Sequence, residues 1–213
     1  MKALYLAAAL VAFQFASAQK TQELKDFINV AIKGDIQMKL VKSNTNKAVY
    51  EAGDDELTIE QDGNSVVFDG DGMVTLYYKG ELEGIAAGAD TQVAGSDEIK
   101  GKSFNLAAAA DSQVSLKLNV QSLMLAAGSD AQVSIKGKTK EMTVTIGSDA
   151  ELDAKDFVAE DAMVTIGSDG QAEIQVKGAV TATVGSDGQL TIYGNPKKVN
   201  ETKGSDAEIT LVK

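Results

Sequence analysis

The tripeptide Gly128-Ser129-Asp130 returns along the chain as Gly147-Ser148-Asp149, Gly167-Ser168-Asp169, Gly185-Ser186-Asp187 and Gly204-Ser205-Asp206. Two looser copies precede it, Gly88-Ala89-Asp90 and Ala109-Ala110-Asp111. Successive aspartates are 18 to 21 residues apart. Self-similarity at a nearly constant period of this size is the mark of a stacked-repeat protein. The repeat therefore predicts one elongated fold built from similar units.

The residues around each of these aspartates alternate in polarity. Positions three and five residues before and after the Asp are mostly Val, Ile, Leu or Ala, whereas positions at even distances are mostly polar. The column three residues after the Asp reads Val93, Val114, Val133, Leu152, Ala172, Leu190 and Ile209. Successive side chains of a strand point to opposite faces. We therefore predict a strand on each side of the Asp, with odd positions in a core and the Asp itself facing solvent.

The two residues that flank each Asp are small, as in Ser129 and Ala131. They share the parity of the core, so we expect both to face inward at a tight corner. A Gly- and Lys-rich turn, such as residues 136–140, is expected to return the chain. A circuit of about 19 residues suits one rung of a parallel β-helix, stacked about 4.8 Å above the previous rung. The prediction is an all-β solenoid.

Residues 19–84 precede the regular repeats and are expected to begin or cap the stack, with residues 85–213 forming the repeats of one continuous domain. Residues 19–26 are polar and predict a loose tail or a short helical turn, and alternation predicts strands at 28–34, 36–40, 57–60, 66–68 and 74–78. Residues 69–72 resemble the start of a calcium loop, but Met73 and Gly80 occupy later ligand positions, so we expect a hairpin turn. Glu201 and Lys203 replace apolar residues in the last repeat, as a polar terminal repeat would.

Residues 1–18 have the layout of a secretory signal peptide: Lys2, a short apolar stretch, and Ala16-Ser17-Ala18 before Gln19. No later apolar run is long enough to span a membrane. The sequence therefore predicts an exported protein of the periplasm, the cell surface or the extracellular space.

The composition excludes several chemistries. The chain has a net charge of −11, one Pro, and no Cys, His, Trp or Arg. It therefore has no thiolate, no imidazole base or metal ligand, and no guanidinium clamp for phosphate. The acidic balance disfavours nucleic acid as a partner. We expect no catalytic residues and no enzyme, although a polysaccharide-cleaving site built on carboxylates is a third alternative.

The chain resembles the head GIN domain family of auto-transporter adhesins. The resemblance rests on the segment Phe27-Ile-Asn-Val-Ala-Ile-Lys-Gly34, the small-residue corners, and Leu190-Thr-Ile-Tyr-Gly-Asn-Pro196 followed by Gly204-Ser205-Asp206. It implies a right-handed β-helix over essentially the whole mature chain. It also implies an adhesin or surface-binding protein of the bacterial envelope, with an unknown glycan or protein as its partner. A periplasmic module that binds cations or polysaccharide is the alternative, and an oligomer joined through the solenoid ends is a further expectation.

One candidate site emerges, the column of repeat aspartates. Its central members are Asp111, Asp130, Asp149, Asp169 and Asp187, with Asp90 and Asp206 at its ends. The favoured interpretation is structural: each carboxylate accepts backbone N–H bonds at its corner. The alternative is a row of weakly bound Ca²⁺ ions, which prefer carboxylate and carbonyl oxygens. No other cofactor is expected.

Overall fold

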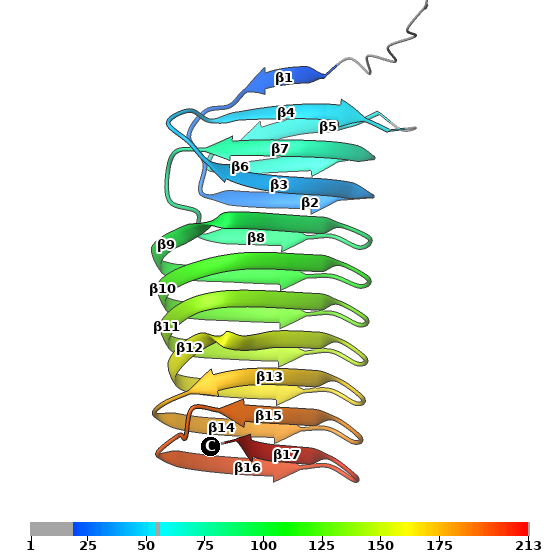
Figure 1. Ribbon diagram of the computed structural model, residues 1–213. Helices are drawn as coiled ribbons and strands as arrows, with labels where there is room; N and C mark the ends of the chain where they lie inside the picture. The colour runs from blue at the N-terminus through cyan, green and yellow to red at the C-terminus, as the bar shows by residue number, and fades with distance from the viewer. Residues whose placement is uncertain (1–18, 54–55, 213) are drawn as a thin grey trace, which may run out of the picture.

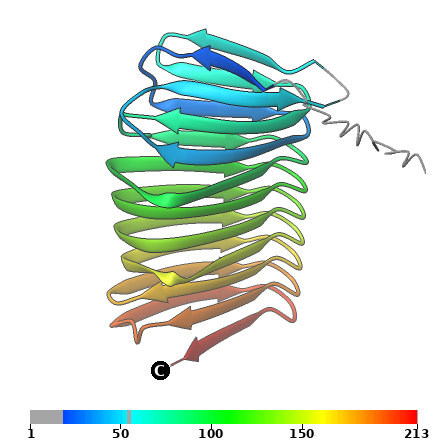
Figure 2. The ribbon, with the colours of Figure 1, turned by 45° about the horizontal axis from the view of Figure 1, so that its top comes forward.

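The computed structural model describes residues 19–53 and 56–212, so the predicted signal peptide lies outside the described part. The described residues form strands β1 to β17 joined by turns, with no helix among them. They build a flattened column of stacked rungs with two layers of strands (Figures 1 and 2). The predicted all-β solenoid is confirmed.

The strands fall into an N-terminal set and a regular set. The N-terminal strands are β1 (Lys20–Glu23), β2 (Asn29–Lys33), β3 (Ile36–Lys42), β4 (Lys47–Ala52), β5 (Thr58–Asp62), β6 (Ser65–Asp69), β7 (Gly72–Tyr78) and β8 (Gly84–Ala87). The regular strands are β9 (Gln92–Ala108), β10 (Gln113–Ala127), β11 (Gln132–Ile146), β12 (Glu151–Ile166), β13 (Gln171–Val176), β14 (Ala179–Val184), β15 (Gln189–Tyr193), β16 (Lys198–Lys203) and β17 (Glu208–Val212).

Neighbouring rungs pair in parallel and in the register of the repeat. Gln113 lies beside Gln132, and Gln132 beside Glu151. Each of these residues follows its own Asp by two positions, so equivalent residues of every rung stack into columns. The side-chain alternation of a strand then sends the odd columns inward and the even columns outward, as the sequence predicts.

Each rung has one tight corner and one wide bend. The Gly-Ser-Asp corners lie along one edge of the column (Figure 1). At the other edge β9 to β12 pass from one layer to the other without a break in the strand. The predicted return turn at residues 136–140 is therefore wrong, because these residues lie inside β11. Gly137 allows the bend: its φ is +121°, and a Cβ there would overlap the carbonyl of Leu118.

The N-terminal strands stack out of sequence order. Strands β2 and β3 form a rung that pairs directly with the rung of β8 and β9. Strands β6 and β7 form the next rung toward the N-terminal end and pair with β2 and β3. Beyond these, β4 pairs with β7 and β5 with β6, both antiparallel, and β1 pairs antiparallel with β4. Residues 19–26 were expected to form a loose tail or a helical turn, and this is wrong where β1 forms a strand. Strand β4 was not predicted. The hairpin predicted at residues 69–72 is also wrong, because these residues form a corner between the two layers.

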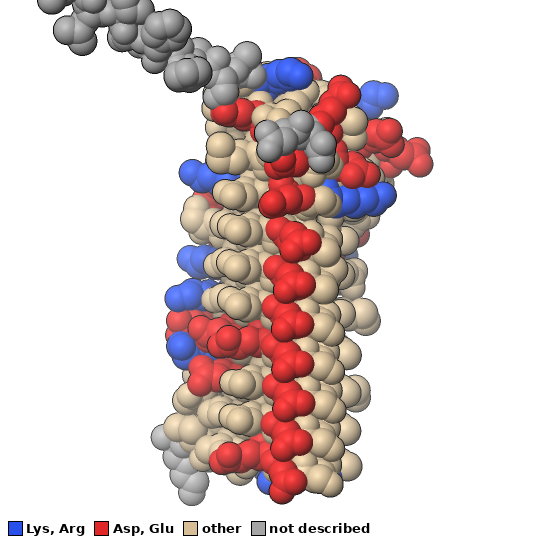
Figure 3. Space-filling view, turned by 90° about the vertical axis from the view of Figure 1, so that its right-hand side faces the viewer, with Lys and Arg blue, Asp and Glu red and all other residues tan. Residues whose placement is uncertain are grey.

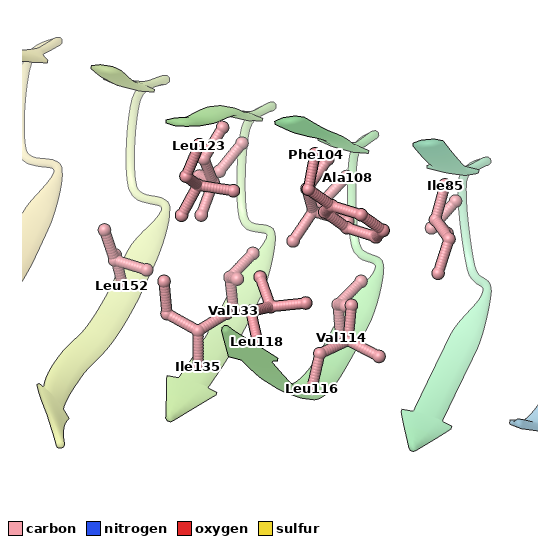
Figure 4. Close-up of a cluster of buried hydrophobic side chains, with 14 of the residues drawn as sticks. Ile85, Phe104, Ala108, Val114, Leu116, Leu118, Leu123, Val133, Ile135 and Leu152 are labelled. Carbon is pink, nitrogen blue, oxygen red and sulfur yellow. The ribbon is translucent and has the colours of Figure 1, made fainter. Parts of the chain in front are cut away.

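The core is a continuous stack of apolar side chains between the layers. Phe104 and Leu123 of one layer face Val114 and Leu116 of the other (Figure 4). The apolar residues predicted to face inward three and five residues from each Asp are buried from the rung of Ile85 to that of Ile192. A single rung could not enclose its own apolar face, so the stability of each rung depends on its neighbours.

Candidate functional site

The repeat aspartates are defined by their backbone conformation. Asp90, Asp111, Asp130, Asp149, Asp169, Asp187 and Asp206 all have φ between +57° and +60°. Gly128, Ser129, Asp130 and Ala131 form a four-residue turn in which the N–H of Ala131 donates to the carbonyl of Gly128 at 3.4 Å. A positive φ at the third residue of such a turn is the signature of type II geometry. Only Gly, Asn and Asp adopt this region readily, which explains the Asp at every corner.

The backbone of each corner continues the hydrogen-bond ladder between rungs. The N–H of Asp130 donates to the carbonyl of Ser148 at 3.2 Å, and that of Asp187 to the carbonyl of Ser205 at 3.0 Å. The predicted role of the carboxylates as acceptors of backbone N–H bonds is not what the structure shows. In the described part of the chain none of the seven carboxylates accepts a hydrogen bond, and none pairs with a lysine.

The residue before each Asp was expected to face inward, and this prediction is wrong. Ser129, Ser148, Ser168 and Ser186 are exposed at the tip of the turn rather than turned inward. The residue after the Asp does face inward, and Ala131 and Ala150 are fully buried. The two central residues of a turn project away from the strands that it joins, so parity counting fails for the residue before the Asp.

The carboxylates form a single acidic line along the corner edge (Figure 3). At a rung spacing of about 4.8 Å, neighbouring charges repel by about 0.9 kcal/mol in water. Among the described residues no three acidic side chains converge as the ligands of one metal ion would. The geometry shows a turn-forming role for the Asp, and calcium binding stays a prediction.

A second feature lies beside this line, on the outer face of one layer. A groove of about 660 Å³ crosses β4, β7, β3, β9, β10, β11 and β12 and follows the long axis of the solenoid. One row of its lining is Gln37, Gln92, Gln113 and Gln132, two residues beyond the corner position. The next row is Lys39, Ala94, Ser115 and Ser134. Ala94, Ser115 and Ser134 in the second row have small side chains, so the surface is hollowed there. The glutamine side chains of the first row lie beside this hollow.

The groove offers neutral hydrogen-bonding groups. Gln92, Gln113 and Gln132 are exposed, and in the described structure their amides make no hydrogen bond to other side chains. Each amide carries two donors and one acceptor oxygen, repeated once per rung. The groove was not predicted from the sequence. The repetition of Gln two residues after the Asp was a visible signal, but the position of β3, β7 and β4 beside β9 was not.

Charged residues are confined to the two ends of the groove. Lys39 and Glu51 lie at the N-terminal end, and Glu151 and Asp153 lie on β12. Beyond β12 the surface becomes an ion-pair cluster, in which Lys155 lies 3.3 Å from Asp153 and 3.7 Å from Glu173. The hydrogen bond to Asp153 raises the pKa of Lys155. The middle of the groove, on β9 to β11, has no charged lining residue among those described.

The outer face of the other layer differs from the groove face. Its two central columns carry no charge from β8 to β14; they are Gly84, Asn105, Met124, Thr143, Met163 and Thr181, and Ala86, Ala107, Ala126, Thr145, Thr165 and Thr183. Met124 and Met163 are 59% and 56% exposed. Neither the groove nor the smaller hollow over β12, β13 and β15 lies on this face.

These features define a class of protein: a parallel β-solenoid with one type II turn per rung and an uninterrupted outer groove. The chain belongs to the family "Putative auto-transporter adhesin, head GIN domain", whose model matches residues 26–196. The family resemblance seen in the sequence is thereby confirmed. No curated protein matches the chain.

Solved structures share the fold at low sequence identity. A crystal structure of a "putative adhesin" from Bacteroides fragilis superposes with a TM-score of 0.82 at 14% identity, covering 92% of this chain and 96% of that one. A "putative adhesin" from Parabacteroides distasonis gives 0.68 at 18% identity, with 92% and 96% covered. A "putative lipid binding protein" from the same species gives 0.65 at 16% identity, with 93% and 98% covered. In the part of the chain that the structure describes, no helix has the length and apolar character needed to cross a membrane.

Proposed function

We propose that this chain is an exported, non-enzymatic binding protein of the bacterial envelope, which holds an extended uncharged glycan in the groove over β3 and β9 to β11. The observation that carries the proposal is the row of glutamine amides beside a floor of Ala94, Ser115 and Ser134. A polymer with hydroxyl groups at regular intervals meets one donor and acceptor set per rung. The groove volume lies within the range of ordinary ligand sites.

The charge distribution favours an uncharged ligand. The chain as a whole is strongly acidic, so a polyanion is repelled on approach. The neutral middle of the groove offers a polycation no carboxylate, and the acidic corner line lies outside the groove lining. Glycan hydroxyls need only hydrogen-bond partners, and amides supply both donors and acceptors.

The absence of catalysis is part of the proposal. A hydrolytic glycosidase needs two carboxyl groups on opposite sides of the scissile bond, separated by a defined distance. The carboxylates of Glu151 and Asp153 lie together at one end of the groove, and the rows beside β9 to β11 offer amides and hydroxyls instead. The family and two of the solved structures above are named as putative adhesins, and the third as a putative lipid binding protein, which also supports a binding role.

A glycan array probed with the purified chain tests the proposal. We expect binding to a subset of neutral linear glycans and little binding to sulfated or uronic acid polymers. Gln113→Ala removes one amide from the row and should weaken binding by roughly 2- to 10-fold, the value of one or two lost hydrogen bonds. Ser115→Gln fills the floor of the groove and should abolish binding.

The matched controls lie outside the groove lining. Gln121 is exposed on β10 at the wide bend, and Thr145 is exposed on β11 in the opposite layer. Gln121→Ala and Thr145→Gln should therefore leave glycan binding unchanged. Equal loss of binding in the Ser115→Gln and Thr145→Gln variants would refute the assignment of the groove, as would a preference for polyanions.

A further inference from the structure

The C-terminal end of the solenoid presents two strand edges. In the described residues β16 pairs only with β14, and β17 pairs only with β15. The other edge of each strand carries backbone N–H and C=O groups that face away from the stack. Leu211 and Val212 are 53% and 38% exposed there, although the residues equivalent to Leu211 are buried in the rungs from Leu116 to Ile192. Such an edge is a template for pairing with another strand.

The two ends of the molecule differ in this respect. At the N-terminal end the antiparallel strands β4 and β5 cover the parallel rungs, and β1 covers β4. The described residues place no such strand over β16 and β17, which lie at the far end of the column (Figures 1 and 2). The question is therefore which strand fits that edge.

The charges in the second half of β16 are antisymmetric about Thr202. Glu201 and Lys203 flank Thr202 on the inward-facing side of the strand, and both are exposed at the end of the stack. When such a strand pairs antiparallel with a copy of itself about Thr202, Glu201 of each copy lies opposite Lys203 of the other.

We propose that two copies of this chain associate end to end, with β16 pairing antiparallel with the partner's β16 and β17 with the partner's β17. The two-fold axis passes close to Thr202 and Thr210, which both lie four residues from Asp206 in the two layers. Glu201 then lies opposite the partner's Lys203, and Lys203 opposite the partner's Glu201. In the other layer Ile209 lies opposite the partner's Leu211, so the apolar core continues across the interface.

The alternative registers are less favourable. Facing residues of two antiparallel strands point to the same side of the sheet. An inward-facing residue must therefore lie opposite an inward-facing residue, so the pair can be centred only on a residue and not between two residues. Centring the pair on Glu201 or on Lys203 sets that charge opposite its own copy, and like charges directly opposite each other destabilise a sheet. The register about Thr202 is the one in which both charged positions are matched.

The association has a consequence for the groove. A two-fold axis perpendicular to the layers keeps each layer on its own side, so the grooves of the two copies open on the same face of one longer rod. Two sites on one rigid body bind a long polymer with greater avidity than either site alone. The association itself rests on β16 and β17 and does not depend on the proposed glycan.

Charge reversal at the interface tests the proposal. We expect the purified chain to show a concentration-dependent dimer by sedimentation velocity. Glu201→Lys or Lys203→Glu creates two like-charge pairs across the two-fold, and each should raise the dissociation constant by about tenfold or more. The double variant E201K/K203E restores both pairs and should restore the dimer. Glu141→Lys, an exposed charge reversal on β11, is the control and should leave the dimer intact.

Crosslinking tests the register itself. The chain has no cysteine, so Thr202→Cys introduces a single thiol close to the two-fold axis, within reach of its own copy. It should form a disulfide dimer under mild oxidation. Thr183→Cys, one rung earlier in the same exposed column, should not. A wild-type chain that stays monomeric at all concentrations, a dimer that survives both single charge reversals, or equal crosslinking of the two cysteine variants would overturn the proposal.

Discussion

Replacing a corner aspartate with asparagine should stabilise the protein. Asp149 lies in the middle of the acidic line, between Asp130 and Asp169, and its φ is +57°. Asparagine adopts this backbone region as readily as aspartate, so Asp149→Asn keeps the turn. It removes a charge whose carboxylate has no hydrogen-bond or ion-pair partner in the described structure. The substitution therefore removes repulsion without removing an attraction.

The magnitude follows from the rung spacing. Each of the two neighbouring charges, about 4.8 Å away, contributes about 0.9 kcal/mol of repulsion in water, or about 1.7 kcal/mol together. Salt at physiological strength reduces this to about half. For a chain of this size 1 kcal/mol corresponds to about 2 to 4 °C in Tm. Asp149→Asn should therefore raise the Tm by about 3 to 7 °C at low salt, with a smaller gain at high salt.

Two further variants separate the effect of the lost charge on stability from the effect of the turn conformation. Asp149→Val loses the same charge but places a β-branched residue at positive φ, so it should be less stable than the Asn variant by about 1 to 2 kcal/mol at every salt concentration. Asp161 serves as the control, since its carboxylate accepts the N–H of Ala179 at 2.7 Å. Asp161→Ala should lose about 1 kcal/mol. Calorimetry at two salt concentrations measures all three, and an Asp149→Asn variant that melts below the wild type would refute the reasoning.

Three further predictions follow from the turns and the core. The Tm should be the same in millimolar Ca²⁺ and in chelator, because the corner carboxylates act by their backbone conformation; a calcium-dependent rise would establish the cation-binding alternative. Gly137→Ala should cost about 1 to 3 kcal/mol in chemical unfolding, because its Cβ meets the Leu118 carbonyl at φ +121°, whereas Gly63→Ala has open space around it and should cost less. Burial, helped by the Asp97 carboxylate, raises the pKa of Tyr78 to about 12. The folded state therefore holds this proton more tightly, and stability should fall by about 2 to 3 kcal/mol as the pH rises from about 10 to 12. Tyr78→Phe should lack this part of the loss in urea titrations, and an identical pH dependence in the variant would contradict the burial of the phenol.

The repetitive part of the fold was predictable because one rung specifies the next. The spacing of Asp130 and Asp149 matches the strand register, in which Gln132 lies beside Glu151. The apolar parity from Val93 to Ile192 matches the buried columns. In a stacked repeat the long-range partner of a residue is its own equivalent one period away, so counting along the sequence predicts contacts that are distant in the chain.

The N-terminal region was less predictable because its pairing is not periodic. The sequence around β2 and β6 shows two strands but not that β2 lies beside β8. The antiparallel strands β1 and β4 have weak alternation, and their partners decide their conformation. The acidic line was found by counting, but the positive φ that explains its aspartates comes from the structure. The groove extends from β9 to β12 across β3, β7 and β4, and the pairing of those N-terminal strands is not periodic.

The side-chain amides of the groove glutamines report directly on whether the groove binds a glycan. The measurement is a titration of the isotopically labelled chain with a neutral glycan selected on the array, followed through the glutamine side-chain amides and the backbone amides. We expect the side-chain amides of Gln92, Gln113 and Gln132 to shift together while that of Gln121 stays in place. Shifts confined to the Ser129-Asp130 turn and its equivalents, with the groove glutamines unmoved, would contradict it.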